Sequence, residues 1–347
     1  MYSSDKSGFK NILLSFYKQI QESEPIFKQT QINLVKERIQ NILYLGMGGS
    51  AIAGDLLYDV LFDDLHVPLD VVRGYIPPGY CNARTLVLVS SYSGNTEETL
   101  SSMEKVRRSG AQIVAITSGG KLAHIAAEEG WPILSLPQGL PPRQSLGYLF
   151  FPIYHLLGHL QLIDHYQKDL HSLTKFIKDK SKRNEYPHGG GKILSLNLAH
   201  TIQNKIPVFY STAPYLRTVS RRWQNQMHEN AKSLAFANVL PEMNHNEIVG
   251  WELESEWLKG LIAIFLENED PHPRIKKRIE LSQKIIKNRG VQVVKIYSSG
   301  KTRLEKVFSL IVLGDWVSYY LAMSYKKDPI QIANIDYLKG ELAKFKG

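Results

Sequence analysis

Short apolar stretches alternate with amphipathic stretches along most of the chain, and this alternation limits the folds that it can adopt. Between residues 41 and 165, five runs have the β-branched and aliphatic composition of buried strands: 41–45, 69–73, 85–90, 112–116 and 133–136. Segments with helical spacing of apolar residues separate most of them, for example 51–61 and 96–108. Strands that alternate with helices form parallel sheets with helices on both faces. The sequence therefore predicts an α/β fold with a doubly wound parallel sheet.

The same alternation begins again in the second half of the chain. Helices are predicted over 192–205, 215–232, 274–289 and 303–325, and strands over 208–211, 260–266 and 292–297. A polar and basic stretch before them ends in three glycines at 189–191 and marks a boundary. We therefore predict two domains of the same kind in tandem, at 41–165 and 192–327, joined by a linker at 166–191. An N-terminal helical segment (1–40) precedes them, and a C-terminal helical segment (328–347) follows.

Composition narrows the cellular setting and the partners. Cys81 is the only cysteine, which excludes an internal disulfide and favours a reducing, cytoplasmic location. The apolar run 149–163 is shorter than the roughly 20 residues that span a bilayer, so we expect no membrane segment. The net charge of +9 is spread along the chain without interleaved aromatic residues. It indicates attraction of a phosphorylated metabolite better than binding of nucleic acid.

Two loops leave predicted strands of the first domain at the edge where open parallel sheets bind ligands. The first, GMGGSA at 46–51, fits the Gly-x-Gly-x-x-Ala pattern of dinucleotide-binding folds, with Asp70 as a candidate ribose-binding acid. A nucleotide-dependent oxidoreductase is therefore one alternative, which titration with NAD(P)H would test. A second loop rich in hydroxyl groups, which a pyrophosphate site would not need, argues against it.

The second loop, SYSGNTEET at 91–99, has the residues of a cradle for one phosphate group. Ser91, Ser93 and Thr96 can donate hydrogen bonds, and the amides of Gly94 and Asn95 lie at a helix N-terminus. Gly94 would let the backbone approach the anion closely. An ordinary N-cap is the simpler interpretation, but it accounts for one hydroxyl residue and not for three. The sequence thus predicts a phosphate monoester site.

These two loops together resemble the sugar isomerase (SIS) domain. More closely, the chain resembles the bifunctional phosphoglucose/phosphomannose isomerases, which have two flavodoxin-like SIS domains in tandem, from about Gly46 to Lys339. Further matching stretches are PPRQSLGY at 141–148, HENAK at 228–232 and NHNEIVGW at 244–251. The second domain has the acidic stretch ENED at 267–270 after its strand, which would repel phosphate. The resemblance likewise implies one phosphate site per chain.

The resemblance implies an aldose–ketose isomerase that needs no cofactor and no metal. Its substrates would be glucose 6-phosphate and fructose 6-phosphate, with mannose 6-phosphate as a further candidate, and its reaction would be ring opening followed by proton transfer through a cis-enediol. It also implies a homodimer whose active sites lie at the subunit interface. The family's phosphate-binding positions fall here on the side chains of Ser50, Ser91, Ser93 and Thr96, with the loop backbone at Gly48, Gly49 and Gly94.

Four further residues match the family's catalytic positions. Glu229 would move the proton between the two carbons, which a positioned carboxylate can do. His245 would open the ring, since histidine titrates near neutrality, and could come from the partner subunit. Arg143 would stabilise the enediolate, and Lys339 would assist at the ring oxygen. His228 is the competing histidine, but it would point about 100° away from Glu229 on a helix.

Some alternatives remain open on sequence alone. Relatives often carry a threonine near 330–332, where this chain has Ile-Gln-Ile, and this departure bears more on phosphomannose activity than on phosphoglucose activity. Another SIS-type isomerase or a non-catalytic sugar-phosphate-binding regulator would keep the same cradle. His155 and His159 are spaced like metal ligands, but leucines surround them and indicate helix packing.

Overall fold

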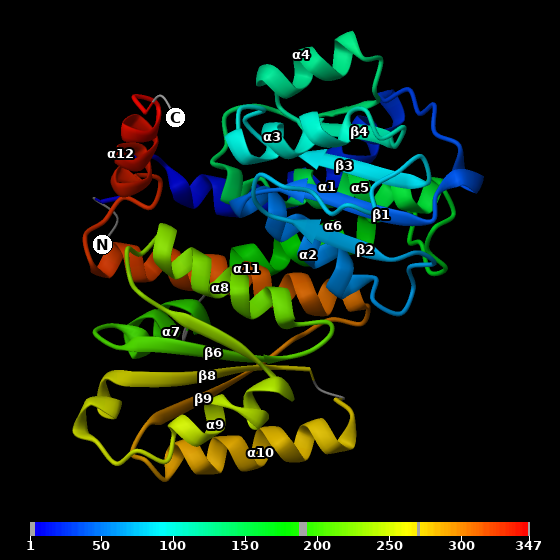
Figure 1. Ribbon diagram of the computed structural model, residues 1–347. Coiled ribbons are helices and arrows are strands. Elements are labelled where there is room, and N and C mark those ends of the chain that lie inside the picture. The colour runs from blue at the N-terminus through cyan, green and yellow to red at the C-terminus, as the bar shows by residue number, and fades with distance from the viewer. Residues whose placement is uncertain (1–3, 187–192, 269–270, 346–347) are drawn as a thin grey trace.

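The structure, a computed structural model, describes residues 4–186, 193–268 and 271–345 and contains two parallel β-sheets with a layer of helices between them (Figure 1). The first sheet has the order β2-β1-β3-β4-β5 and the second the order β7-β6-β8-β9. Every pairing between these strands is parallel. The predicted fold class, with two doubly wound α/β halves, is confirmed.

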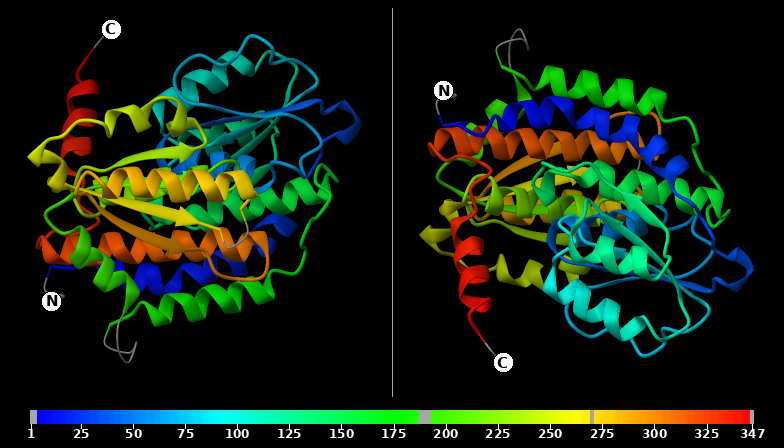
Figure 2. Two further views of the ribbon diagram at one scale, coloured as in Figure 1. Left: turned by 90° about the horizontal axis from the view of Figure 1, so that it is seen from below. Right: turned by 90° about the horizontal axis from the view of Figure 1, so that it is seen from above.

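The first sheet is buried on both faces. Its strands are β1 (Asn41–Gly46), β2 (Leu69–Val72), β3 (Thr85–Ser90), β4 (Gln112–Thr117) and β5 (Ile133–Ser135). All six residues of β3 are buried, as expected for the central strand of a covered sheet. Helices α3 (Glu97–Val106) and α4 (Gly120–Glu128) cover the outer face (Figure 2). The strand order reverses between β1 and β3, where α2 (Gly48–Val60) begins.

The second sheet is built in the same way with one strand fewer. It contains β6 (Ile206–Thr212), β7 (Phe236–Leu240), β8 (Leu261–Glu267) and β9 (Gln292–Tyr297). Its outer face carries α10 (Pro273–Lys287), with the short elements η3 (Glu242–His245), α9 (Glu247–Gly250) and η4 (Glu256–Gly260) beside it (Figure 2). Its inner face carries α7 (Leu194–Ile202), α8 (Arg217–Glu229) and α11 (Arg303–Ser324).

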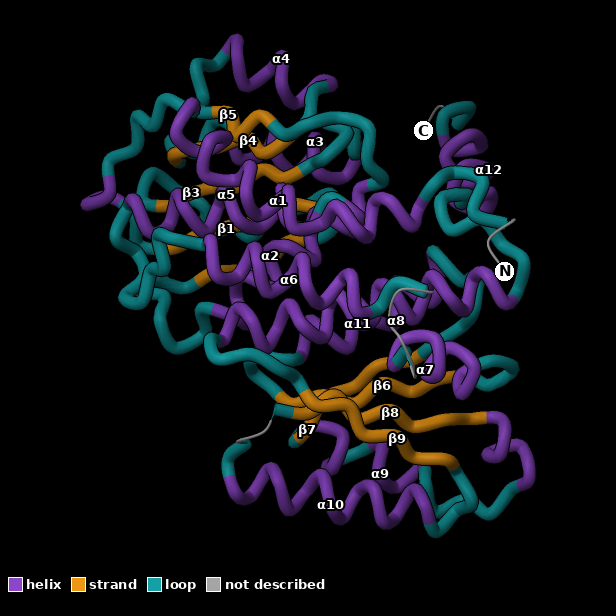
Figure 3. Tube along the Cα trace, turned by 180° about the vertical axis from the view of Figure 1, so that it is seen from behind, coloured by secondary structure: helices purple, strands orange, loops and turns teal. Residues whose placement is uncertain are grey.

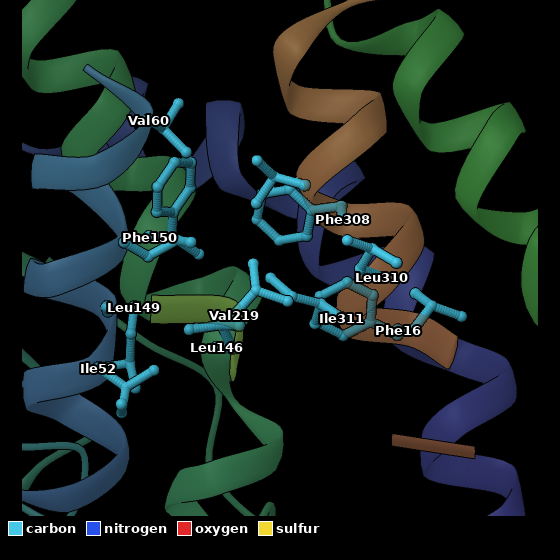
Figure 4. Packing of buried hydrophobic residues seen from close by; sticks show 14 of the residues in the cluster. Phe16, Ile52, Val60, Leu146, Leu149, Phe150, Val219, Phe308, Leu310 and Ile311 are labelled. Carbon is cyan, nitrogen blue, oxygen red and sulfur yellow. The ribbon is translucent and has the colours of Figure 1, made fainter. Parts of the chain in front are cut away.

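The helices between the sheets share one hydrophobic core. From behind, α1 (Phe9–Gln29), α5 (Leu146–His159) and α6 (His171–Arg183) are seen to lie in the same layer as α2 and α11 (Figure 3). Phe150 of α5, Phe308 of α11 and Val219 of α8 meet in this layer (Figure 4). At roughly 25 cal/mol per Å² of buried apolar surface, such a shared core strongly stabilises the relative placement of the two sheets.

Helix α11 is long and apolar enough to cross a membrane by length and composition. However, 94% of its apolar window is buried inside the fold. Thr302 and Glu305 form a capping box at its start, so the helix begins where its buried face begins. We therefore interpret α11 as the central core helix of the molecule.

Several elements differ from the sequence-based expectation. The range 166–191, predicted as a linker, contains α6, whose basic residues hide a buried stripe of Leu173, Ile177 and Ser181. Ser181 donates a hydrogen bond to the carbonyl of Leu13 (2.8 Å), which ties α6 to α1. The glycines at 189–191 lie outside the described residues. The proposed division into domains stays a prediction.

Two smaller differences concern single elements. The sequence pattern does not predict strand β7, because it is a short edge strand whose residues are mostly partly exposed. A single helix is expected over 143–163, where the apolar run 149–163 lies, but the structure divides this region into η2 (Pro142–Gln144) and α5. The helices expected at the two ends are present in the described part of the chain, as α1 with the short turn η1 (Lys36–Arg38) and as α12 (Ala333–Leu342).

The buried carboxylate of Asp59 joins helix α2 of the first half to helix α8 of the second half. Asp59 on α2 accepts a hydrogen bond from the amide of Thr218 (2.6 Å) and forms an ion pair with Arg217 (2.9 Å) at the start of α8. The N-cap residue of α8 is Leu216, whose apolar side chain cannot accept a capping hydrogen bond. Asp59 therefore serves as a cap supplied by another helix, at the positive end of the α8 dipole. Burial nevertheless raises the pKa of Asp59 from 3.8 to about 6, because the opposing contacts do not fully offset desolvation.

We predict that Asp59→Asn flattens the pH dependence of stability. An acid whose pKa is raised on folding contributes most below its unfolded pKa of 3.8, and this contribution is lost as the pH rises through about 6. The difference corresponds to about 3 kcal/mol. Urea unfolding of both proteins at several pH values between 3.5 and 7 measures it. The difference in unfolding free energy should shift in favour of the variant as the pH rises, whereas parallel pH profiles would contradict the assignment.

Candidate active site

The two loops identified in the sequence lie next to each other at the reversal point of the first sheet. β1 ends at Gly46 and β3 at Ser90, and these two residues are direct neighbours in the sheet register. Helix α2 starts two residues after β1, and the loop 91–96 leads from β3 into α3. The hydroxyl of Ser50 accepts a hydrogen bond from the amide of Tyr92 (3.2 Å), which joins the first turn of α2 to the second loop.

The hydroxyl groups of the cradle differ in their roles. Ser91 is buried, and its hydroxyl lies 2.9 Å from that of Thr96. Thr96 is the N-cap residue of α3 but makes no side-chain cap hydrogen bond. Ser93 is exposed, and its hydroxyl accepts only a long bond from the amide of Asn95 (3.3 Å). The simple N-cap interpretation therefore does not account for Thr96, and the first turn of α3 keeps amides available for an anion.

Two glycines shape this edge of the sheet. Gly94 has a positive φ of 69°, and a Cβ there would lie 1.8 Å from the carbonyl oxygen of Gly119. A Cβ on Gly49 would lie 2.9 Å from the backbone of Pro142 and Arg143. The missing side chain of Gly49 thus lets η2 pack directly on the first turn of α2. Arg143 consequently starts beside the phosphate cradle.

The side chain of Arg143 reaches from the first half of the molecule to the second. It is 4% exposed and donates hydrogen bonds from Nε to Asn230 Oδ1 (2.7 Å) and from Nη2 to the carbonyl of Pro329 (2.6 Å). Its Nη1 lies 3.3 Å from Glu229 Oε2. Burial lowers the pKa of Arg143, which Glu229 opposes, but a guanidinium keeps its charge at physiological pH. The structure therefore brings the predicted Arg143 and Glu229 into contact.

A buried polar network holds Arg143 in this orientation. Arg222 on α8 donates from Nη1 to the backbone carbonyl of Arg143 (3.0 Å) and from Nη2 to Asp315 on α11 (2.8 Å). Gln226 donates to the other carboxylate oxygen of Asp315 (2.7 Å). Burial raises the pKa of Asp315, and Arg222 opposes this rise. The sequence offered one signal for this network, the polar residues on α8, while Asp315 and Asn230 were missed.

Glu229 borders a pocket of about 490 Å³ between the end of α8 and the C-terminal segment. A pocket of this size can hold a small phosphorylated sugar. The Glu229 side chain is 28% exposed, so its carboxylate is accessible while it contacts Arg143. Gln331 and Ile332, which belong to the stretch that departs from the family pattern, line the opposite wall. His228 turns its ring to the backbone of Ala235, 3.0 Å from the carbonyl oxygen, as expected for a structural histidine.

His245 and Lys339 lie apart from this cluster within the chain. His245 is exposed at the end of η3, on the face of the second sheet that carries α10, whereas α8 covers the other face (Figure 1). Its neighbour Asn244 donates to Ser282 of α10 (2.8 Å). Lys339 lies on α12, none of whose residues is buried. A single chain therefore does not assemble all four predicted catalytic residues.

The described residues contain no group of three or more histidine, cysteine or acidic side chains that could hold a metal ion. Of His155 and His159, which have the spacing of metal ligands in the sequence, His155 packs inside the fold. His155 is buried between the hydroxyls of Tyr166 (2.8 Å) and Ser23 (3.2 Å), and burial lowers its pKa to about 4. Asp70, the candidate ribose acid, accepts a hydrogen bond from Tyr80.

Comparisons with known proteins show which family and which fold this chain resembles. The family model described as the bacterial phospho-glucose isomerase C-terminal SIS domain matches residues 192–342. A bifunctional phosphoglucose/phosphomannose isomerase of Caldicellulosiruptor bescii is 40% identical over 94% of this chain and 97% of its own length. One of Aquifex aeolicus is 35% identical over 88% and 91%. A solved hypothetical protein of Thermus thermophilus shares the fold, with a TM-score of 0.75 and 15% identity over 98% of this chain and 91% of that one.

We predict that Ser93→Ala combined with Thr96→Ala weakens the affinity for sugar phosphates at least tenfold. Each lost hydrogen bond to a charged group is worth about 1.5–3 kcal/mol. Calorimetric titration with fructose 6-phosphate measures the change. Ser101→Ala, on a helix residue of α3 away from the loop, is the matched control and should bind normally. Unchanged affinity of the double variant would place the phosphate elsewhere.

Proposed function

This chain belongs to the family of bifunctional phosphoglucose/phosphomannose isomerases, and we propose that it interconverts glucose 6-phosphate and fructose 6-phosphate as its main reaction. One observation carries the proposal. Arg143 starts at the backbone that packs on Gly49, beside the phosphate cradle, and ends against the carboxylate of Glu229. The side chain of Arg143 thereby connects the phosphate cradle to Glu229, the proposed acid–base residue.

The proposed chemistry follows from these positions. The substrate phosphate binds the hydroxyls of Ser50, Ser91, Ser93 and Thr96 together with the amides at the start of α3. Glu229 removes a proton from one of the two carbons C1 and C2 and returns it to the other. Arg143 stabilises the negative charge of the enediolate, because its guanidinium is already oriented before the reaction. Its partners Asn230, Pro329, Ile330 and Glu229 keep the guanidinium in place at little entropic cost during turnover.

We further propose that the active protein is a homodimer with shared active sites. His245 is exposed on the far side of the second sheet, so ring opening by this residue requires a neighbouring chain. Exposed apolar side chains follow it closely in the chain: Val249 is 59% exposed, Leu253 53% and Trp257 60%. Exposed apolar side chains that gather in one patch are typical of an interface. Helix α12, with Lys339 and the 71% exposed Tyr337, is a second unpaired surface that a partner chain could complete.

The substrate range and location are part of the same proposal. Gln331 and Ile332 line the pocket at the stretch where relatives often carry a threonine, so we expect glucose 6-phosphate to be preferred over mannose 6-phosphate. The single cysteine, partly buried and unpaired, suits a cytoplasmic enzyme. A non-catalytic regulator is disfavoured because it would have no need for the network that orients Arg143 toward Glu229.

We predict that Glu229→Gln lowers kcat by about 10²–10⁴-fold, the usual contribution of a general acid–base group, with KM changed only a few-fold. Coupled assays with fructose 6-phosphate and mannose 6-phosphate, run side by side, measure both constants. Glu128→Gln, at an exposed position at the end of α4, is the matched control and should behave as wild type. Near-normal turnover of the Glu229 variant would remove it as the base.

Treatment with EDTA should leave the isomerase activity unchanged. In the proposed mechanism Arg143 supplies the positive charge at the developing enediolate, so no metal is required. The assay compares dialysed protein before and after chelation. A loss of activity that zinc or manganese restores would overturn the metal-free mechanism.

A further inference from the structure

Lys232 makes an unusual set of contacts just behind the proposed base. Its ammonium, which has three N–H donors, lies within hydrogen-bond distance of four backbone carbonyls: Glu229 (2.8 Å), Asn230 (3.3 Å), Asp328 (2.9 Å) and Pro329 (3.1 Å). These acceptors are neutral carbonyl oxygens, so the contact is not an ordinary surface ion pair. The backbone at Lys232 has a positive φ of 55°, which turns the chain back on the end of α8.

The four carbonyls belong to two chain segments that border the same pocket: Glu229 lines it, and the other three residues lie close in the chain to residues that line it. The first two lie at the C-terminus of α8, where carbonyls have no partner within the helix and the dipole is negative. The other two belong to the segment between α11 and α12, which continues directly into the pocket-lining residues 331–335. Arg143 donates to the same carbonyl of Pro329 (2.6 Å). Two cations thus hold the Glu229 wall against the C-terminal wall.

Asp328 gives this segment a further attachment. Its carboxylate accepts hydrogen bonds from the hydroxyl (2.6 Å) and the amide (3.1 Å) of Ser7. The segment is therefore fixed from the N-terminus and from η2 as well as from Lys232. Of the residues that make these contacts, only Lys232 and Arg143 also contact Glu229, Lys232 at its carbonyl and Arg143 at its carboxylate.

We propose that Lys232 is a positioning residue of the isomerase site, whose ammonium sets the position of Glu229 relative to the C-terminal pocket wall. This inference rests on the proposed function of Glu229. Lys232 does not have to touch the substrate in this role, because it acts through the backbone carbonyl of Glu229 and through Asp328 and Pro329. A displacement of about 1 Å at a catalytic group can cost about a hundredfold in rate.

The charge of Lys232 is sensitive to pH. Partial desolvation of the ammonium, followed by the charge of Arg143, lowers the pKa of Lys232 to about 8. Lys327 adds to the decrease, while Asp328 and Glu229 oppose it. The ammonium is therefore present below this pKa and is lost as the pH rises through about 8. Activity that depends on the ammonium should fall on the alkaline side of neutrality.

The test compares Lys232→Met, Lys232→Arg and Lys326→Met in the full-length protein. Lys326 is a matched control, since it is also an exposed lysine with a positive φ (54°) after a helix, but it does not line the pocket beside Glu229. We expect Lys232→Met to lower kcat about 10- to 100-fold with KM changed less than about threefold. Lys232→Arg should keep most of the activity. Its fall in kcat on the alkaline side should move from near pH 8 to above pH 9, because arginine does not titrate there. Lys326→Met should match wild type.

Two kinetic outcomes would overturn the proposal. One is a Lys232→Met protein whose kcat and pH profile equal those of Lys326→Met. The other is an alkaline limb near pH 8 that persists in an active Lys232→Arg protein. Hydrogen exchange gives a readout independent of the reaction. Amides at 228–234 and 330–335 should exchange faster in Lys232→Met than in wild type, and equal rates would also overturn the proposal. If the wild-type protein isomerises neither fructose 6-phosphate nor mannose 6-phosphate, the proposed function is wrong. Hydrogen exchange then still tests whether Lys232 holds the two segments together.

Discussion

The contact between Arg143 and Glu229 depends on the close packing of η2 on Gly49. Without a side chain at Gly49, the backbone of η2 approaches the first turn of α2 and directs Arg143 across to α8. A guanidinium buried to this extent is costly unless each donor has a partner. Asn230, Pro329, Ile330 and Glu229 supply those partners from the second half of the chain. The site is therefore a product of the interface between the two α/β halves.

The central helical layer makes this interface rigid enough for chemistry. Phe150, Val219 and Phe308 pack in one core between the sheets (Figure 4). Asp59 joins α2 to the start of α8. Helix α2 begins at the phosphate cradle, and helix α8 ends at Glu229. A contact that fixes the end of one to the start of the other thereby helps to set the distance from phosphate to base. Preorganisation of this kind lets the protein act without a large rearrangement.

What the sequence could predict depended on the range of the interactions involved. The strand pattern and the hydroxyl loop are local signals, and the structure contains both elements where they were expected. The amphipathic stripe of α6 was hidden by its many lysines. The roles of Asp315 and Lys232 could not be inferred, because their partners are distant in the chain or are backbone carbonyls. The contributions predicted for His245 and Lys339 remain predictions, since a single chain leaves both exposed.

The spatial relation between phosphate anchor and base is tested most directly by a crystal structure of the protein with bound fructose 6-phosphate. The account predicts the phosphorus atom among the hydroxyls of residues 91–96 at the start of α3. It also predicts C1 and C2 of the opened sugar within roughly 3 Å of a Glu229 carboxylate oxygen, the reach of a general base. A ligand that leaves the hydroxyl loop empty, or whose reacting carbons lie far from Glu229, would contradict the account.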